Sequence, residues 1–494
     1  MQPYRNSFRH VMKATSLFGG VQVFNILISI VRSKFIALFI GPTGMGIASL
    51  FNTTLNVVDA VTNLGLNRSA VKDISYAKEN YEANNIARTI HVLKRLVWFT
   101  AVIGAVLMMI TSPWLSEIAF ESKEYTISFI WLSAALLFKQ FTHSNLAILQ
   151  GLQKLGNLAK ANLVGNTVGL LITVPLYYFF RIDAIVPAII IASLISFIVT
   201  LYYTNKAKVE KVALTNKEAF SEGKEMIHLG VTLSVSSVIT LIAMYVIQIY
   251  ISNKGGTEAV GYYHAGMVIL NTYVGLVFNA MSTDYFPRLS AVSDAIEKIR
   301  NIVFEQAFIA VLLILPIIVI FVAFAPFIIT LLYSQEFSPT VQFVSWGILG
   351  MLFKAVSFSL GYIIIAKGDS KVFIKTAIGF NITLVVMNII GYTYWGLEGL
   401  GISYFIYFLI HFIVIWLITY YRYNFTFKKE FYYIFGISIV LCSLAFLLSN
   451  IEDDVLKYVS LSVMIIISSI FSVYHIDKKI EIRDLIQNFF RRKK

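Results

Sequence analysis

Apolar runs of about 20 residues recur along the whole chain, each long enough for a helix to cross the hydrocarbon of a membrane. Short polar segments separate them. The pattern predicts fourteen spans, near residues 14–40, 44–66, 90–111, 127–150, 158–180, 183–204, 225–252, 260–282, 302–325, 341–366, 373–395, 398–421, 432–449 and 456–475. A membrane barrel would show short segments of alternating polarity instead. The expected fold is therefore an all-α polytopic membrane protein.

Composition supports this class and narrows the chemistry. Hydrophobic residues make up 57% of the 494 residues and charged residues 14%, which is too apolar for a soluble protein. The first apolar run is long and contains Arg32 and Lys34, so no cleavable signal peptide is expected. One cysteine, Cys442, excludes an intramolecular disulfide, and the seven histidines lack metal-ligand spacing. No metal or cofactor is expected.

The second half of the chain matches the first at a spacing of 215 residues. The clearest pairs are Gly46 with Gly261, Asn56 with Asn271, Trp131 with Trp346, Lys139 with Lys354, and Asn166 with Asn381. Each half holds six predicted spans, and because six is even the two repeats share one orientation. Parallel repeats of this kind are typical of transporters, with the substrate site between the halves.

The repeat predicts the domain organisation. Residues 1–204 form an N-lobe of helices 1 to 6, and residues 205–224 form a basic cytoplasmic linker. Residues 225–421 form a C-lobe of helices 7 to 12, and residues 422–475 add helices 13 and 14. The basic tail, 476–494, alternates apolar and basic residues, which fits either the anionic inner leaflet or a solvated end.

The distribution of positive charge predicts the orientation. With the N-terminus in the cytoplasm, 32 of the 40 Lys and Arg residues lie in cytoplasmic segments and the adjoining helix ends, against four in external loops. This is a strong positive-inside signal that places both termini in the cytoplasm. The net charge of +13 therefore indicates topology and lipid contact, and no nucleic-acid partner is expected.

Two polar stripes run along the first two spans. Steps of three and four residues place Gln22, Asn25, Ser29 and Arg32 on one face of helix 1, and Asn52, Asn56, Asp59 and Asn63 on one face of helix 2. Polar faces inside a membrane usually line a cavity or contact a partner helix. We expect these residues to line a cavity, with Asp59 acting in gating or ion coupling. The alternative is that Arg32 or Lys34 merely neutralises Asp59 in a static helix pair.

Lys139 and Lys354 are repeat mates near the middle of helices 4 and 10. A pseudo-twofold axis should place them on opposite walls of one cavity. Two ammonium groups repel unless an anion lies between them, and a pyrophosphate is such an anion. The alternative is that both lysines extend to a membrane interface.

The charges inside the predicted spans are mostly positive. The spans contain four cations and one clear acid, Asp59, and this balance favours an anionic substrate over a cationic drug. The cations are Arg32, Lys34, Lys139 and Lys354. These four cations are the expected substrate-binding residues. His143, one turn beyond Lys139, could exchange protons near neutral pH and is a second candidate for gating or ion coupling. A lone histidine inside a membrane is more often simply hydrogen-bonded.

The short loops argue against an enzyme. No loop exceeds roughly 25 residues, so there is no room for a catalytic domain. The turn from Gly41 to Gly46 superficially resembles a phosphate loop, but it follows a membrane helix and fits a tight hairpin turn. No other segment resembles a nucleotide-binding loop, so ATP-driven transport would need a partner protein.

The segment from Lys34 to Ala48, KFIALFIGPTGMGIA, resembles the first hairpin of Wzx-type O-antigen and enterobacterial-common-antigen flippases. These belong to the multidrug/oligosaccharidyl-lipid/polysaccharide (MOP) exporter superfamily. The stretch 63–68 and Val71-Lys72 are similar to the same family, and the plan of two lobes plus two helices covers the chain. Lys34 sits where the family motif has a lysine.

The resemblance implies a flippase of the bacterial inner membrane. Such proteins move an oligosaccharide repeat unit, linked through pyrophosphate to undecaprenol, to the outer leaflet for O-antigen or other surface polysaccharide. They work by alternating access through a cationic cavity. The implied partners are this lipid-linked oligosaccharide and membrane lipids. Polysaccharide polymerase machinery as a partner, and H⁺ or Na⁺ as a coupling ion, stay open.

Other functions remain as alternatives. A lipid II-type flippase and a small-molecule antiporter belong to the same superfamily, and they differ in the lipid that accumulates or in drug sensitivity. A membrane glycan polymerase or ligase is a different class. Those enzymes usually need a large external loop, which this chain lacks.

Overall fold

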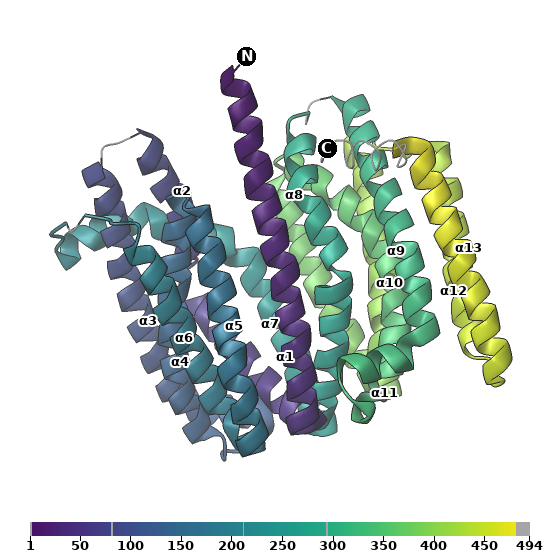
Figure 1. Cartoon of the computed structure of the whole chain (residues 1–494), viewed down its shortest axis with the longest axis horizontal. Coiled ribbons are helices and arrows are strands. Elements are labelled where there is room, and N and C mark those ends of the chain that lie inside the picture. Colours follow the sequence, from purple (N-terminus) through teal and green to yellow (C-terminus); the bar gives the residue numbers. More distant parts are fainter. Residues whose placement is uncertain (1, 81–82, 211, 293–294, 481–494) are drawn as a thin grey trace, which may run out of the picture. The chain divides into compact units, whose positions relative to one another are not determined.

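The computed structural model describes residues 2–80, 83–210, 212–292 and 295–480, without the side chains of the first 23 residues and of residues 80, 83, 280, 283, 284 and 480. Within these ranges the regular elements are helices and no strand occurs, so the expected all-α fold is confirmed (Figure 1). The α-helices are α1 (Gln2–Thr62), α2 (Leu66–Asn80), α3 (Ala83–Phe120), α4 (Thr126–Gly151), α5 (Leu155–Phe180), α6 (Ile185–Asn205), α7 (Asn216–Val268), α8 (Leu276–Ser290), α9 (Ile296–Leu332), α10 (Thr340–Ala366), α11 (Ser370–Tyr423), α12 (Lys429–Ser449) and α13 (Asp454–Ile480).

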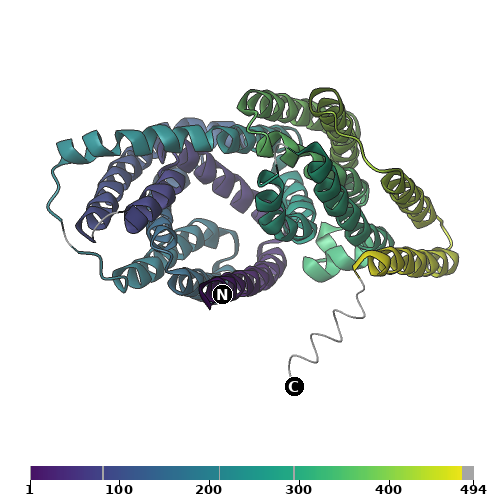
Figure 2. The same cartoon turned by 90° about the horizontal axis from the view of Figure 1, so that it is seen from above.

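The chain forms two compact units. Unit 1 comprises Met1–His264 with Leu332–Ser334, and unit 2 comprises Ala265–Leu331 with Gln335–Lys494. The repeat-based lobes, 1–204 and 225–421, place the boundary elsewhere in the sequence, and that division stays a prediction. Figure 2 shows the same fold from above.

Unit 1 has an aromatic centre. The fully buried ring of Phe51 on α1 lies 5.1 Å from that of Phe129 on α4, at an interplanar angle of 76°. Phe120 and Tyr125, at the α3–α4 connection, stack at 4.1 Å beside them. Lipid tails are as apolar as these side chains, so close packing rather than transfer from water holds such helices together. A second apolar cluster joins α2, α3 and α4 around Leu66, Ile74 and Leu93.

In unit 2, α10 is the buried helix around which its neighbours pack. Tyr285 of α8 donates a hydrogen bond from its hydroxyl to the carbonyl of Ser359, at 2.6 Å. Trp346 donates from its indole nitrogen to Glu398 of α11, at 3.0 Å. These bonds satisfy polar groups inside the bundle, where unsatisfied groups are costly. They therefore fix α10, which carries Lys354, between α8 and α11.

Breaks in the backbone recur with the period of the repeat. Gly41 in α1 and Gly256 in α7 have φ of 62° and 74° with extended ψ. Arg181 and Gly396 have φ and ψ of 52° and −129°, and 54° and −135°. Each pair is 215 residues apart. Two halves of one sequence that bend at the same positions fold along the same path, as the residue matches predict.

Nine helical segments within the described ranges are long and apolar enough to cross a membrane. Four of them contain a break at Gly41, Arg181, Gly256 or Gly396, and dividing them there gives thirteen segments. The helix α4, whose most apolar window is less hydrophobic than those of the nine, would be the fourteenth. Since these candidates rest on length and composition, the count of fourteen spans stays a prediction.

Helices extend into both the predicted linker and the predicted tail, whose bounds stay a prediction. The linker 205–224 is irregular only to residue 215, because α7 begins at Asn216. Thr215 caps this helix: its hydroxyl and backbone N–H both bond to Glu218, the reciprocal arrangement of a capping box. In the tail, α13 continues to Ile480, and the remainder, 481–494, lies outside the described residues.

Candidate functional site

One lysine–asparagine pair occurs twice. In unit 1, Lys139 Nζ of α4 donates a hydrogen bond to Asn56 Oδ1 of α1. In unit 2, Lys354 Nζ of α10 donates to Asn271 Oδ1 at 3.1 Å. Both pairs are separated by 83 residues in sequence, because each residue is the repeat mate of its counterpart. The repeat therefore preserves a specific polar contact as well as helix positions.

Lys139 belongs to a larger group in unit 1, which we name the Asp59 cluster: Asn56, Asp59, Asn63, Lys139 and His143. Asp59 is 4% exposed, and its Oδ2 lies 3.3 Å from Lys139 Nζ and 3.5 Å from His143 Nδ1. Asn63 donates to Asp59 Oδ1 at 3.4 Å. A buried carboxylate requires such partners, since an isolated charge in this environment is very unfavourable.

His143 is within ion-pair distance of Asp59 but is not hydrogen-bonded to it. Its buried Nδ1 has no hydrogen-bond partner among the described residues. A protonated His143 would complete an ion pair with Asp59, whereas a neutral one leaves Lys139 as the main counter-charge. The contact between Asp59 and His143 is therefore an ion pair only when His143 is protonated.

The predicted alternative, in which Arg32 or Lys34 neutralises Asp59, is wrong, because the ion-pair partners of Asp59 lie on α4. Arg32 instead donates from Nη2 to the carbonyl of Asn166 on α5, at 3.3 Å. Asn166 in turn donates to Asn25 Oδ1 at 3.0 Å, so this part of the helix 1 stripe faces α5. The buried Nε of Arg32 has no hydrogen-bond partner in the described part of the chain.

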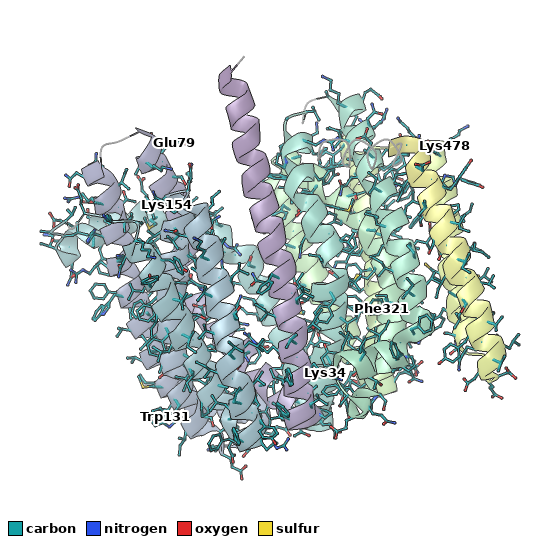
Figure 3. The ribbon with its side chains drawn as sticks, in the orientation of Figure 1. Lys34, Glu79, Trp131, Lys154, Phe321 and Lys478 are labelled. Carbon is teal, nitrogen blue, oxygen red and sulfur yellow. The ribbon has the colours of Figure 1, made fainter. Side chains whose placement is uncertain are left out.

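Of the other candidate residues on α1, Asn52 and Lys34 have side chains that the structure describes. Asn52 is exposed and donates back to the carbonyl of Ala48 in its own helix, at 2.8 Å. Lys34 is half-buried on α1 (Figure 3). The side chain of Gln22 lies outside the described residues. The structure thus brings together Asn56, Asp59, Asn63, Lys139 and His143, and separately joins Arg32 with Asn25.

Lys354 has a different environment from Lys139, which we name the Lys354 cluster: Asn271, Phe278, Lys354, Tyr404 and Phe408. Its ammonium lies 5.6 Å from the ring centroid of Phe278 and 5.1 Å from that of Phe408. Tyr404 donates its hydroxyl proton to Asn271 Oδ1 at 2.9 Å. Ring faces attract cations without neutralising them. No carboxylate of the described residues pairs with Lys354.

The difference follows from the sequence at the equivalent positions. Val274 stands where unit 1 has Asp59, and Phe358 where it has His143. Asn271 also lies in a short π-helix, Ile269–Val274, a distortion that occurs frequently at functional sites. Each lysine is therefore bonded to an asparagine, but the net charge around the two lysines differs.

Sequence reasoning missed the partners of Lys354. Asn271 could have been found, because Asn56 and Lys139 recur at one spacing in both halves. Nothing in the sequence singled out Tyr404 or Phe408, since aromatic residues are common throughout the chain. Three-dimensional packing of α11 against α10 decides which of them reach the ammonium.

Comparison with known proteins identifies relatives of this chain. A family model described as "Polysaccharide biosynthesis protein" matches residues 35–342. The "Putative O-antigen transporter" of Shigella flexneri is 24% identical over 355 residues, covering 70% of this chain and 82% of that protein. The "Lipid III flippase" of Escherichia coli (strain K12) is 19% identical over 346 residues, covering 69% of this chain and 82% of the relative.

Solved structures share the fold. The lipid II flippase MurJ, in an inward closed conformation, has a TM-score of 0.71 at 16% identity, covering 95% of this chain and 99% of the other. A MATE family multidrug resistance transporter of the MOP superfamily, in an inward-facing conformation, has a TM-score of 0.67 at 15% identity, covering 83% and 98%. At these identities the likeness concerns the fold alone.

Proposed function

Because the chain belongs to the polysaccharide biosynthesis protein family of the MOP exporter superfamily, we propose that it is a flippase for an undecaprenyl-pyrophosphate-linked oligosaccharide repeat unit. It carries this unit from the inner to the outer leaflet of the bacterial inner membrane by alternating access, for O-antigen or other surface polysaccharide. It is a multi-pass membrane transporter, not an enzyme. Both termini lie in the cytoplasm.

The observation that supports this substrate class is the pair of repeat-related lysines. Each ammonium bonds to a neutral amide oxygen, which orients it without removing its charge. Lys354 lies among aromatic rings and has no carboxylate partner within the described ranges. A buried cation of this kind favours an anion, and a diphosphate supplies one with several acceptor oxygens. Lys139, Lys354, Arg32 and Lys34 are the proposed binding residues.

Arg32 adds a second donor of this type in unit 1. Its guanidinium is anchored at one end by the carbonyl of Asn166, and its buried Nε lacks a described partner. Buried polar groups are nearly always hydrogen-bonded, so an unpartnered one points to a missing acceptor. A diphosphate oxygen is a suitable acceptor. The polar residues Gln22, Asn25, Asn52, Asn56 and Asn63 line the path in this proposal.

Asp59 and His143 are the proposed gating or coupling residues. They share one lysine, and a proton on His143 changes the net charge of the Asp59 cluster by one. If an arriving diphosphate draws Lys139 away, Asp59 needs another cation. A proton on His143 or a sodium ion would supply it. The coupling ion is therefore H⁺ or Na⁺ in this proposal.

Depletion in the native bacterium tests the substrate. Loss of this protein should cause an undecaprenyl-pyrophosphate-linked oligosaccharide to accumulate on the cytoplasmic leaflet, with loss of the surface polysaccharide. Accumulation of lipid II instead would identify a lipid II-type flippase. Unchanged lipids together with increased drug sensitivity would identify a small-molecule antiporter. Re-expression of the wild-type chain must restore the starting state in each case.

A further inference from the structure

A pocket of about 510 Å³ lies in unit 1, away from the Asp59 cluster. One wall is α3, which contributes His91, Lys94, Arg95 and Trp98. The other wall is the end of the linker and the start of α7, including Leu214. The spacings of three, one and three residues place the four α3 side chains on one face of the helix. We name this feature the basic pocket.

The positive charge of the basic pocket is not neutralised by the described part of the chain. Neither Lys94 nor Arg95 has a carboxylate within ion-pair distance among the described residues. Lys94 is half-buried and Arg95 is exposed. The pocket therefore presents two cationic side chains, Lys94 and Arg95, with His91 one turn away.

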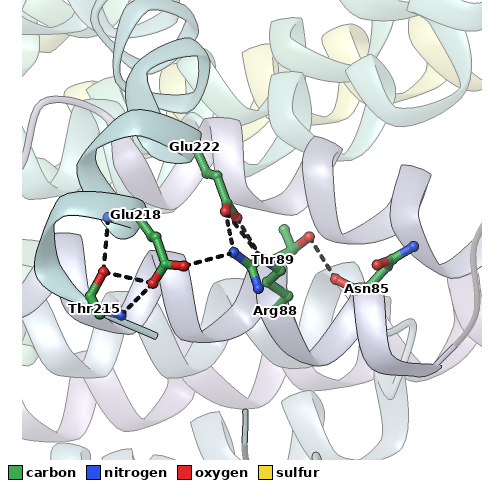
Figure 4. Close-up of polar contacts among 6 residues, drawn as sticks. All are labelled: Asn85, Arg88, Thr89, Thr215, Glu218 and Glu222. Carbon is green, nitrogen blue, oxygen red and sulfur yellow. Dashed lines mark hydrogen bonds and ion pairs between the residues drawn. The ribbon is translucent and has the colours of Figure 1, made fainter. Parts of the chain in front are cut away.

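Arg88, less than two turns earlier on α3, shows the contrast (Figure 4). Its guanidinium nitrogens bond to both oxygens of Glu222, at 2.9 and 3.0 Å from Nε, and lie 3.7 Å from Glu218. Glu218 is itself held by the Thr215 cap. Glu218 and Glu222 of α7 are therefore engaged by Arg88, and the cations of the basic pocket need another counter-charge.

The sequence of α3 places the pocket at the membrane surface. After Arg95 no charged residue occurs until Glu117, an uncharged stretch long enough to cross the bilayer. Trp98, 51% exposed, stands at the start of this stretch, and tryptophan is enriched at membrane interfaces. Lys94 and Arg95 thus lie at the depth where lipid phosphates lie, on the positively charged side of the protein.

From this geometry we propose that the basic pocket binds the phosphate headgroup of an anionic phospholipid. Lys94 and Arg95 bind the phosphate oxygens, while Trp98 and Leu214 contact the glycerol and the first acyl carbons. Basic pockets on the cytoplasmic side of membrane proteins recognise anionic lipids by this chemistry. The bound lipid bridges α3 and the segment that leads into α7. The inference does not depend on what the chain transports.

The lipid is a better occupant than the diphosphate of a transported substrate. None of the residues of the Asp59 cluster lines the basic pocket. Both ligands nevertheless offer phosphate oxygens. Pyrophosphate alone must therefore be one arm of the test.

The experiment measures lipid binding to the purified full-length protein by native mass spectrometry and by thermal unfolding. The probes are phosphatidylglycerol, zwitterionic phosphatidylcholine and inorganic pyrophosphate, added to detergent-solubilised protein. Wild type should bind phosphatidylglycerol and be stabilised by it, with little effect of the other two. Lys94→Gln/Arg95→Gln should weaken this binding roughly thirtyfold, at about fivefold for each charge removed near the surface.

Lys154→Gln is the matched control, because it removes one exposed positive charge from unit 1 outside the pocket and leaves the acids held by Arg88 in place. It should bind phosphatidylglycerol like wild type. Equal binding by the Lys94→Gln/Arg95→Gln variant and the control would overturn the proposal. So would stabilisation by pyrophosphate that matches that by phosphatidylglycerol, because a free diphosphate would then be the better ligand. If the double variant does not fold, Lys94→Gln alone should show the fivefold loss. Normal binding of phosphatidylglycerol by Lys94→Gln would then overturn the proposal.

Discussion

Lys139 Nζ lies 3.3 Å from Asp59 Oδ2, whereas its repeat mate Lys354 has two aromatic rings and no described carboxylate nearby. Both repeats therefore have a lysine bonded to an asparagine, but the other groups that contact the two lysines differ. In unit 1 the lysine charge is balanced by an acid. In unit 2 no acid of the described residues balances it. This asymmetry predicts different consequences for substitutions at equivalent positions.

Substitution of Asp59 should be rescued by substitution of its partner. Asp59→Asn leaves Lys139 without its counter-charge, and breaking a partly buried pair should cost roughly 1 to 3 kcal/mol of stability together with much of the transport activity. Asp59→Asn/Lys139→Gln removes both charges and should recover stability. The measurements are thermal unfolding in detergent and flipping in proteoliposomes. A double variant less stable than Asp59→Asn alone would contradict the pairing.

Substitution of Lys354 should not be rescued in this way. Lys354→Gln removes a cation that has no described acidic partner, so transport should fall strongly while stability changes little or improves. Lys354→Arg should be milder because the charge remains. Adding Asp59→Asn should not restore flipping to Lys354→Gln, whereas it should partly restore Lys139→Gln.

The matched control for Lys354→Gln is Lys375→Gln, which removes one exposed positive charge from the same unit.

If two lysines hold one diphosphate they act as a unit, so Lys139→Gln/Lys354→Gln should lose less transport activity than the sum of the single losses. Transport at the wild-type rate by Lys354→Gln, at equal protein level, would remove this residue from the binding site.

The all-α fold and the repeat could be predicted from the sequence because both depend on periodic features of the chain. Apolar runs of this length indicate membrane helices. The residue matches at a spacing of 215 agree with the backbone breaks at Gly41 and Gly256, which have the same spacing. Helical periodicity also placed Asn56, Asp59 and Asn63 on one face. It did not identify the opposing helix. The face of α1 that carries Asp59 meets α4, while the face that carries Arg32 meets α5, and only the packing determines this.

Asp369 predicts a pH-dependent contribution to the stability of unit 2. It caps α11 by accepting from the backbone N–H of Val372 at 3.2 Å, and accepts from Arg422 Nε at 2.7 Å. The hydrogen bond from Arg422, followed by that from Val372, lowers the pKa of this carboxyl below its ordinary value. A lowered pKa stabilises the folded state above the unfolded pKa, and this stabilisation is lost as pH falls through the folded pKa.

Asp369→Asn should therefore unfold at a lower temperature than wild type near neutral pH, with a difference that shrinks in acid. Thermal unfolding across the acidic range measures this. Asp454→Asn is the control, since it removes a single exposed pair with Lys457 and should have little effect. A difference between Asp369→Asn and wild type that persists unchanged into strong acid would rule out the ionised carboxylate as its source.

Gly46 and Gly261 are repeat mates whose backbones come into contact in unit 1. A Cβ added at Gly46 would overlap the carbonyl oxygen of Thr257, and one added at Gly261 would overlap that of Pro42. One turn along, Ser49 and His264, also repeat mates, lie 2.9 Å apart in a side-chain hydrogen bond. This contact between equivalent segments depends on glycine, because no side chain fits between the two backbones.

Gly46→Ala or Gly261→Ala should therefore force the two segments apart. We expect a loss of about 1 to 3 kcal/mol, the usual cost of overpacking, and reduced flipping because the contact between the two segments is disturbed. Gly379→Ala in α11, where the new Cβ meets nothing within 4 Å, is the control. It should be neutral or stabilise by up to about 1 kcal/mol, the helix propensity gained by replacing glycine. Thermal unfolding and proteoliposome flipping distinguish these outcomes: if Gly46→Ala matches Gly379→Ala in both, the close approach has no role in the transport cycle.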